Sequence, residues 1–132
     1  MFYNTVMETE AFEELVIAAV ERLPQEFRDL LENVDIVVAD YPSPDQRSRG
    51  ESRRALLGLY EGVPRTERGA HYQLVMPDKI TLFQKNIEDA CASPEEIPGE
   101  IESVVRHEIA HHFGMNDEEL RRIERRRRRR LR

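Results

Sequence analysis

Two histidines and a glutamate near the end of the sequence have the types and spacing of a metal-dependent hydrolytic site. The stretch HEIAH, residues 107–111, has the form H-E-x-x-H. Residues four apart lie on the same side of a helix, so the imidazoles of His107 and His111 can reach one ion. Glu108 follows the first imidazole and can accept a proton from water at that ion. The pattern predicts a metal site with Glu108 as the general base.

The residues that follow the second histidine offer a third ligand. Gly114 permits a left-handed backbone turn, which would bring the next residues back toward the metal. Asp117, three residues later, is then placed to complete the ligand set. The whole pattern reads H-E-x-x-H-x-x-G-x-x-D, and each additional fixed position makes chance agreement less frequent.

Zinc suits this predicted ligand set. It accepts imidazole nitrogen and carboxylate oxygen in a tetrahedral arrangement, and a catalytic site keeps the fourth position for water. Zinc lowers the pKa of such a water to about 7 and polarises carbonyl groups. The pattern therefore predicts one Zn²⁺ per chain and hydrolysis of a peptide bond, with a peptide or an unfolded protein as the substrate.

Several of these residues also have structural interpretations. Asn116 or Asp117 would make a good N-cap for the following helix, with Glu119 completing a capping box after Asn116. His112 falls one residue away from the line of the two histidine ligands, so we expect it to pack against or support the site. His71 follows a polar stretch and is expected at the surface.

The motif resembles that of the zincins, in the metzincin-style pattern with Asp in place of the third His. More closely, the sequence is similar to the small bacterial zincin-like metallopeptidase family. The resemblance covers most of residues 10–123 and includes the segments LLGLYEGVPRTERG, PDKITLFQKNIEDAC and RHEIAHHFGMNDEEL. It implies a minimal zincin fold, with His107, His111 and Asp117 as metal ligands and Glu108 as the catalytic acid/base.

The sequence also departs from the wider metzincins. No methionine follows Asp117, so the Met-turn beneath the metal is absent, and metzincin substrate pockets are not carried over. No tyrosine follows the motif either, so an oxyanion stabiliser must come from elsewhere, with Tyr60 and Tyr72 as candidates. The sequence assigns no substrate-binding residue.

Length and composition bound the class of protein. The 132 residues suit a single domain, and 39% hydrophobic with 35% charged residues indicate a soluble globular chain. No stretch is apolar for long enough to span a bilayer, and the first residues lack the pattern of a secretory signal, so we expect a cytoplasmic protein. The single cysteine, Cys91, fits a reducing compartment and is expected to be buried.

The net charge of -6 is unevenly distributed. Residues 121–132 hold nine of the 20 basic residues and one acid, which leaves 11 basic and 25 acidic residues in 1–120. The acidic body argues against a nucleic-acid-binding domain. The run Arg125–Arg130 can bind nucleic acid, anionic lipid or an acidic partner, but a solvated helix end is the favoured interpretation, because no aromatic residue interleaves the arginines. We therefore expect a domain over 1–123 and a basic tail over 124–132. The alternative function is a metal-binding module with negligible turnover that docks a partner through this tail.

Hydrophobic periodicity predicts an α+β domain. Apolar residues recur at helical spacing from Phe12 to Leu23, with Thr5 and Glu8 as a capping box, and a second helix is expected from Pro24. Strands are predicted over 34–39, 56–60, 72–76 and 79–83, with a hairpin turn at 77–78. The expected architecture is a minimal zincin-like fold with a small mixed sheet, an active-site helix and flanking helices.

The helix that carries the motif is expected to begin near Gly99, because Pro98 and Gly99 interrupt the preceding pattern. It should end at Gly114, and a final helix should follow from about Asn116. Its buried face is predicted to comprise Ile101, Val105, Ile109 and either His112 or Phe113.

Overall fold

The computed structural model describes residues 7–62, 77–116, 118–119, 121–123 and 125. Its elements, in order, are α1 (Thr9–Glu21), α2 (Gln25–Leu30), β1 (Val34–Ala39), β2 (Gly58–Glu61), β3 (Asp78–Phe83), α3 (Gln84–Ala90), the 3-10 helix η2 (Pro94–Glu96) and α4 (Ile97–His112). Beyond α4, the described residues between 118 and 125 are also helical. The α+β class expected from the sequence is confirmed.

The three described strands form a small mixed sheet. Their order is β1-β3-β2, in which β3 runs parallel to β1 and antiparallel to β2. The central position of β3 explains why residues 80–83 are all buried. The predicted strand over 34–39 is confirmed at both ends, whereas the strand predicted over 56–60 lies two residues later at its start. The strand predicted over 72–76, and hence its hairpin, lies outside the described residues.

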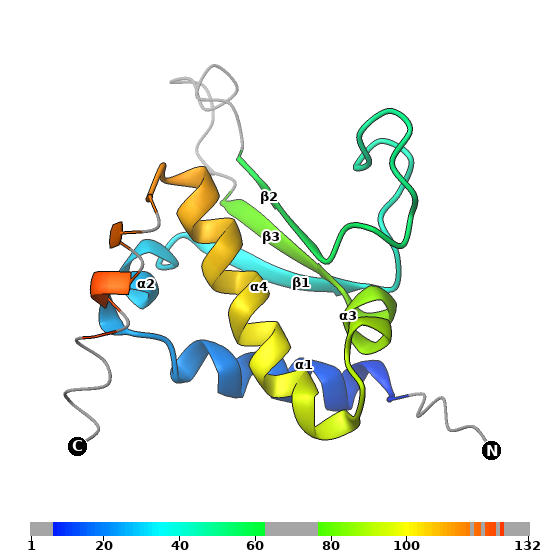
Figure 1. The fold of residues 1–132 in the computed structure, drawn as a ribbon, viewed down its shortest axis with the longest axis horizontal. Helices are drawn as coiled ribbons and strands as arrows, with labels where there is room; N and C mark the ends of the chain where they lie inside the picture. The colour runs from blue at the N-terminus through cyan, green and yellow to red at the C-terminus, as the bar shows by residue number, and fades with distance from the viewer. Residues whose placement is uncertain (1–6, 63–76, 117, 120, 124, 126–132) are drawn as a thin grey trace.

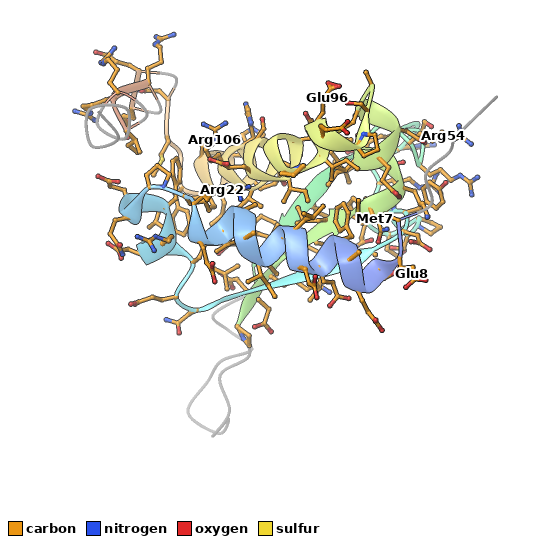
Figure 2. The ribbon with its side chains drawn as sticks, turned by 90° about the horizontal axis from the view of Figure 1, so that it is seen from below. Met7, Glu8, Arg22, Arg54, Glu96 and Arg106 are labelled. Atoms are coloured by element: carbon orange, nitrogen blue, oxygen red, sulfur yellow. The ribbon has the colours of Figure 1, made fainter. Side chains whose placement is uncertain are left out.

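Helices α1 and α4 cover one face of this sheet (Figures 1 and 2). Helix α4 contacts α1 as well as β2 and β3, and Arg22 at the end of α1 lies 3.8 Å from Glu102 of α4. Apolar side chains of both helices and of the sheet form one core, as the helical spacing of α1 indicated. Its fully buried members include Phe12, Phe27, Ile80, Leu82, Ile87, Ile101, Val105 and Ile109.

Three helix starts differ from the predictions, and one helix was not predicted. Helix α4 begins at Ile97, because Pro98 sits in the first turn, where a helix does not need its missing N–H. The sequence analysis did not predict α3, which follows β3 without an intervening turn. Helix α1 begins at Thr9 with Glu8 at the N-cap, so the predicted capping box, which needs Glu8 inside the first turn, is wrong; Thr5 itself lies outside the described residues. Pro24 is the N-cap residue of α2 and not its first helical residue, so α2 begins one residue later than predicted, at Gln25.

The C-terminal end of α4 is a glycine-terminated turn, as predicted. Gly114 has φ +67°, a left-handed conformation that a residue with a Cβ adopts only at a cost. Met115 N donates to Ala110 O at 2.8 Å, and Gly114 N donates to His111 O at 3.4 Å, which is the Schellman pattern. The predicted buried face is wrong at this end, because His112 is exposed and Phe113 is 44% exposed.

No helix among the described residues is both long and apolar enough to cross a membrane.

Candidate metal and catalytic site

Strand β2 and helix α4 lie side by side, and two residues along the strand correspond to four along the helix. Two residues along a strand advance about 6.6 Å, and four along a helix advance about 6 Å. A Cβ placed on Gly58 would lie 2.6 Å from Val104 Cγ1, so the strand backbone approaches α4 directly at this point. Two residues on, Tyr60 meets Glu108. The close approach at Gly58 thus sets which residue of β2 faces the predicted base.

Glu108 is held by the backbone of β2. Tyr60 N donates to Glu108 Oε1 at 3.1 Å. Phe83 N donates to Leu57 O, so the odd-numbered residues of this strand pair with β3 and the N–H of Tyr60 points to the opposite edge, toward α4. Partial burial raises the pKa of Glu108 above its ordinary value, while the Tyr60 N–H and the charges of His111 and His107 act in the opposite direction. A half-buried carboxylate with one fixed oxygen is well suited to accept a proton.

The imidazole of His107 is oriented by its own helix. His107 Nδ1 lies 2.7 Å from Ser103 O, one turn earlier, and 3.4 Å from Ser103 Oγ. A proton on Nδ1 donated to this carbonyl leaves Nε2 as the nitrogen with a free lone pair. Metal-binding histidines commonly have their second nitrogen fixed in this way. The observed geometry therefore fits a His107 that binds a metal through Nε2.

His111 follows one turn after His107 on α4, and both side chains are exposed. Among the described residues, no group of three or more His, Cys, Asp or Glu side chains is placed to hold an ion. The predicted third ligand, Asp117, lies outside them, as do His71 and Tyr72. The described part of the chain therefore carries Glu108 and the two predicted histidine ligands on one helix, without a complete ligand set.

Asn116 caps the N-terminus of the final helix. Its side-chain Oδ1 accepts a hydrogen bond from Glu119 N at 2.8 Å, three residues later. This is the N-cap hydrogen bond of the final helix, one of the two placements that the sequence left open.

A pocket of about 280 Å³ opens between the beginning of β2 and α4, beside the predicted base. Its surface is mainly apolar. The residues of α4 that line it recur every three or four positions, so they lie on one side of this helix. The lining residues are Leu56, Leu57, Gly58, Glu100, Ser103, Val104, His107 and Glu108. The predicted catalytic group thus faces a cavity that can receive part of a substrate.

Tyr60 joins more parts of this site than the sequence indicated. Its ring stacks on His112, with centroids 3.7 Å apart and an angle of 13° between the planes. Its hydroxyl donates to Asp78 Oδ2 of β3 at 2.9 Å. This hydrogen bond does not direct the hydroxyl at His107 and His111, as an oxyanion stabiliser would require. The expectation that His112 packs beside the site is confirmed, although its ring is exposed.

The local sequence carries a signal for only one of these supporting residues. Ser103 could be found from helix geometry, because the carbonyl four residues before a helical histidine lies within reach of its ring. Tyr60 is 48 residues from Glu108, and no spacing rule connects them. Cys91 was expected to be buried but is only half-buried beside the core. Burial, followed by the charges of Glu100 and Glu96, raises the pKa of its thiol, which disfavours the reactive thiolate.

The model of a family described as zincin-like metallopeptidase matches residues 31–127, which include β1 to α4 and the whole H-E-x-x-H-x-x-G-x-x-D stretch. A search of curated proteins finds no significant match.

Proposed function

The chain belongs to the zincin-like metallopeptidase family, and from this premise we propose that it is a zinc-dependent peptidase. The observation that carries the proposal is the placement of Glu108. Its carboxylate is half-buried and held by the Tyr60 N–H, immediately after one of two exposed imidazoles that are four residues apart. A structural zinc site does not need a carboxylate fixed beside its ligands, whereas hydrolysis does.

We assign His107, His111 and Asp117 as the ligands of one zinc ion. The bond between His107 and Ser103 supports the first assignment, because it leaves Nε2 to face outward. Asp117 is supported by the motif, and the capping bond of Asn116 means that the final helix does not require Asp117 as its cap. When bound, zinc would supply Lewis-acid chemistry, lowering the pKa of a water and polarising a carbonyl.

Glu108 acts as the general base and then as the general acid in this proposal. Its Oε1 is fixed by Tyr60, so the proton is taken up at Oε2 and later passed to the leaving amine. Raising the carboxyl pKa by burial makes this oxygen a stronger base than an exposed carboxylate.

A peptide is the substrate class that the surroundings favour. Strand β2 lies at an edge of the described sheet, but its Tyr60 N–H already donates to Glu108, so the pocket beside this strand is the better indication of a peptide substrate. The pocket between β2 and α4 offers apolar walls from Leu57 and Val104 to one of its side chains. We therefore propose peptides or unfolded proteins as substrates.

The domain and tail boundaries are also proposals. Ile123 is buried within the core, which supports a domain that extends to residue 123. The tail over 124–132 lies beyond this last core residue, and we assign it no part in the metal site.

The proposal is tested by metal content together with cleavage. The purified full chain should bind about one zinc per molecule, and its X-ray absorption spectrum should show nitrogen and oxygen neighbours without sulfur. Cleavage of a peptide library should stop on chelation and return when zinc is added. Zinc binding without cleavage of any peptide would support the alternative, a metal-binding module that docks a partner through its arginine tail.

Asp117→Asn separates a ligand from a cap. Both side chains cap helices nearly equally well, but neutral Asn is a poor zinc donor. The substitution should leave the stability of the metal-free protein nearly unchanged and weaken zinc binding by at least the ~10–100-fold typical of changes around metal ligands. Calorimetric zinc titration decides the question, and unaltered affinity would exclude Asp117 as a ligand.

A further inference from the structure

We propose that Tyr60 is a positioning residue, and that its stack with His112 holds both the base Glu108 and the end of the motif helix in place. The inference rests on the proposed function only where it refers to zinc. Its structural part concerns contacts between β2 and α4 in which no metal takes part.

The ring of Tyr60 is fixed from several directions. It stacks on His112 at 3.7 Å and meets the edge of Phe113 at 6.1 Å, while His112 and Phe113 meet each other edge to face at 4.9 Å. The hydroxyl donates to Asp78 on the neighbouring strand. The two edge-to-face contacts have the geometry that aromatic pairs favour, and the Tyr60–His112 pair adds a close, nearly parallel contact. Two neighbouring rings and one hydrogen bond therefore define where the ring of Tyr60 lies.

The position of the ring determines the position of the base. The amide that donates to Glu108 Oε1 belongs to the same residue as the stacked ring. Moving the ring away from α4 moves this amide away from the carboxylate. On α4, the residue that stacks on the Tyr60 ring and the residue that accepts the Tyr60 N–H hydrogen bond lie about one helical turn apart, because His112 follows Glu108 by four residues.

The stack also fixes the end of the helix from which the chain continues to Asp117. His112 directly follows the proposed ligand His111 and precedes the left-handed turn at Gly114. Both His112 and Phe113 are exposed, so these rings add little to the buried core. Their contact with Tyr60 instead ties the last turn of α4 to the edge of the sheet, and one residue thereby links both halves of the proposed site.

Two substitutions at His112 test this inference. His112→Ala removes the stack, whereas His112→Phe keeps an aromatic ring but cannot bind a metal. We expect the zinc dissociation constant, measured by competition with a chromophoric chelator, to rise about tenfold or more in His112→Ala and to stay within about threefold in His112→Phe. Tyr60→Leu should weaken zinc binding as His112→Ala does. Tyr41→Leu, the same substitution at a half-buried tyrosine that packs against Arg53, is the matched control and should have no effect.

Hydrogen exchange of the Tyr60 amide in the metal-free full chain provides a second readout that needs neither zinc nor turnover. Losing the stack should accelerate exchange about threefold to tenfold in His112→Ala, and His112→Phe should restore slow exchange. Equal loss of zinc in both variants would make His112 a ligand and overturn the inference, as would unchanged exchange in His112→Ala. If the parent binds no zinc, the proposed function fails, and the exchange measurement still decides the role of the stack.

Discussion

Gly58→Ala should destabilise the protein, because this glycine is where β2 touches the motif helix. An added Cβ would lie 2.6 Å from Val104 Cγ1 and 3.3 Å from Thr81 O. Neither neighbour yields easily, since valine has one strongly preferred rotamer in a helix and the carbonyl belongs to the central strand. Gly58 does not have a positive φ, so an alanine there would clash with its neighbours but would not strain the backbone.

Two opposing effects set the magnitude. Inserting a methyl group into a well-packed contact costs about 1–3 kcal/mol. Replacing glycine also restricts the unfolded chain, which returns about 0.4–1 kcal/mol. The steric effect is the larger, so the free energy of unfolding should fall by about 1–2 kcal/mol.

Urea denaturation of the metal-free protein, followed by circular dichroism, measures this loss. Gly99→Ala is the matched control, because a Cβ there meets nothing within 4 Å and α4 favours alanine, so stability should hold or rise by up to about 1 kcal/mol. The double variant Gly58→Ala/Val104→Ala should show a coupling of at least ~1 kcal/mol, because removing Cγ1 makes room for the new methyl group. A Gly58→Ala protein as stable as its parent would refute the proposed register between β2 and α4.

Three further outcomes follow from the described contacts. Gly114→Ala should cost about 1–2 kcal/mol of stability, measured by the same denaturation, because the residue has φ +67°; an unchanged midpoint would contradict the left-handed turn. Glu108→Gln should stabilise the metal-free protein at pH 7, by no more than about 1 kcal/mol since the carboxylate is only half-buried. Because burial raises the pKa of Glu108 in the folded state, its charged form destabilises the fold at pH values above the unfolded pKa, whereas below that pKa the carboxyl is protonated in both states. The gain in stability from Glu108→Gln should therefore vanish near pH 4. A gain that persists at that pH would exclude burial of the charge as its cause. Deleting residues 124–132 should leave zinc affinity and cleavage of a neutral peptide nearly unchanged, and loss of zinc would show that the tail supports the site.

Local patterns predicted the elements that local forces determine. The β-branched run over 34–39 forms a strand with the predicted bounds, and the glycine at 114 ends the helix as expected. The sequence pattern predicts the start of α4 two residues too late, because Pro98 resembles an interruption although the first turn of a helix tolerates proline. Helix α3 was missed because Gln84 continues directly from β3 with no turn residue between them.

The site divides in the same way. The sequence predicts His107, Glu108 and His111 as site residues because helical spacing places them near one another, and the structure has all three on α4. The partners of Glu108 and His112 on β2 could not be found, because tertiary packing across 48 residues brings Tyr60 to α4. The close approach at Gly58 is likewise invisible in the sequence, since a glycine in a strand-like segment indicates equally well a bulge, a bend or a contact.

The central claim is that Glu108 is the base of a zinc-dependent peptidase, and the most direct test compares the parent with Glu108→Gln at equal zinc occupancy. Glutamine keeps an oxygen to accept the Tyr60 N–H but has no basic site for the proton. We predict that kcat/KM on a cleaved peptide falls at least ~10²–10⁴-fold while zinc content stays at about one per chain. Equal kcat/KM for the two zinc-loaded proteins would contradict the account.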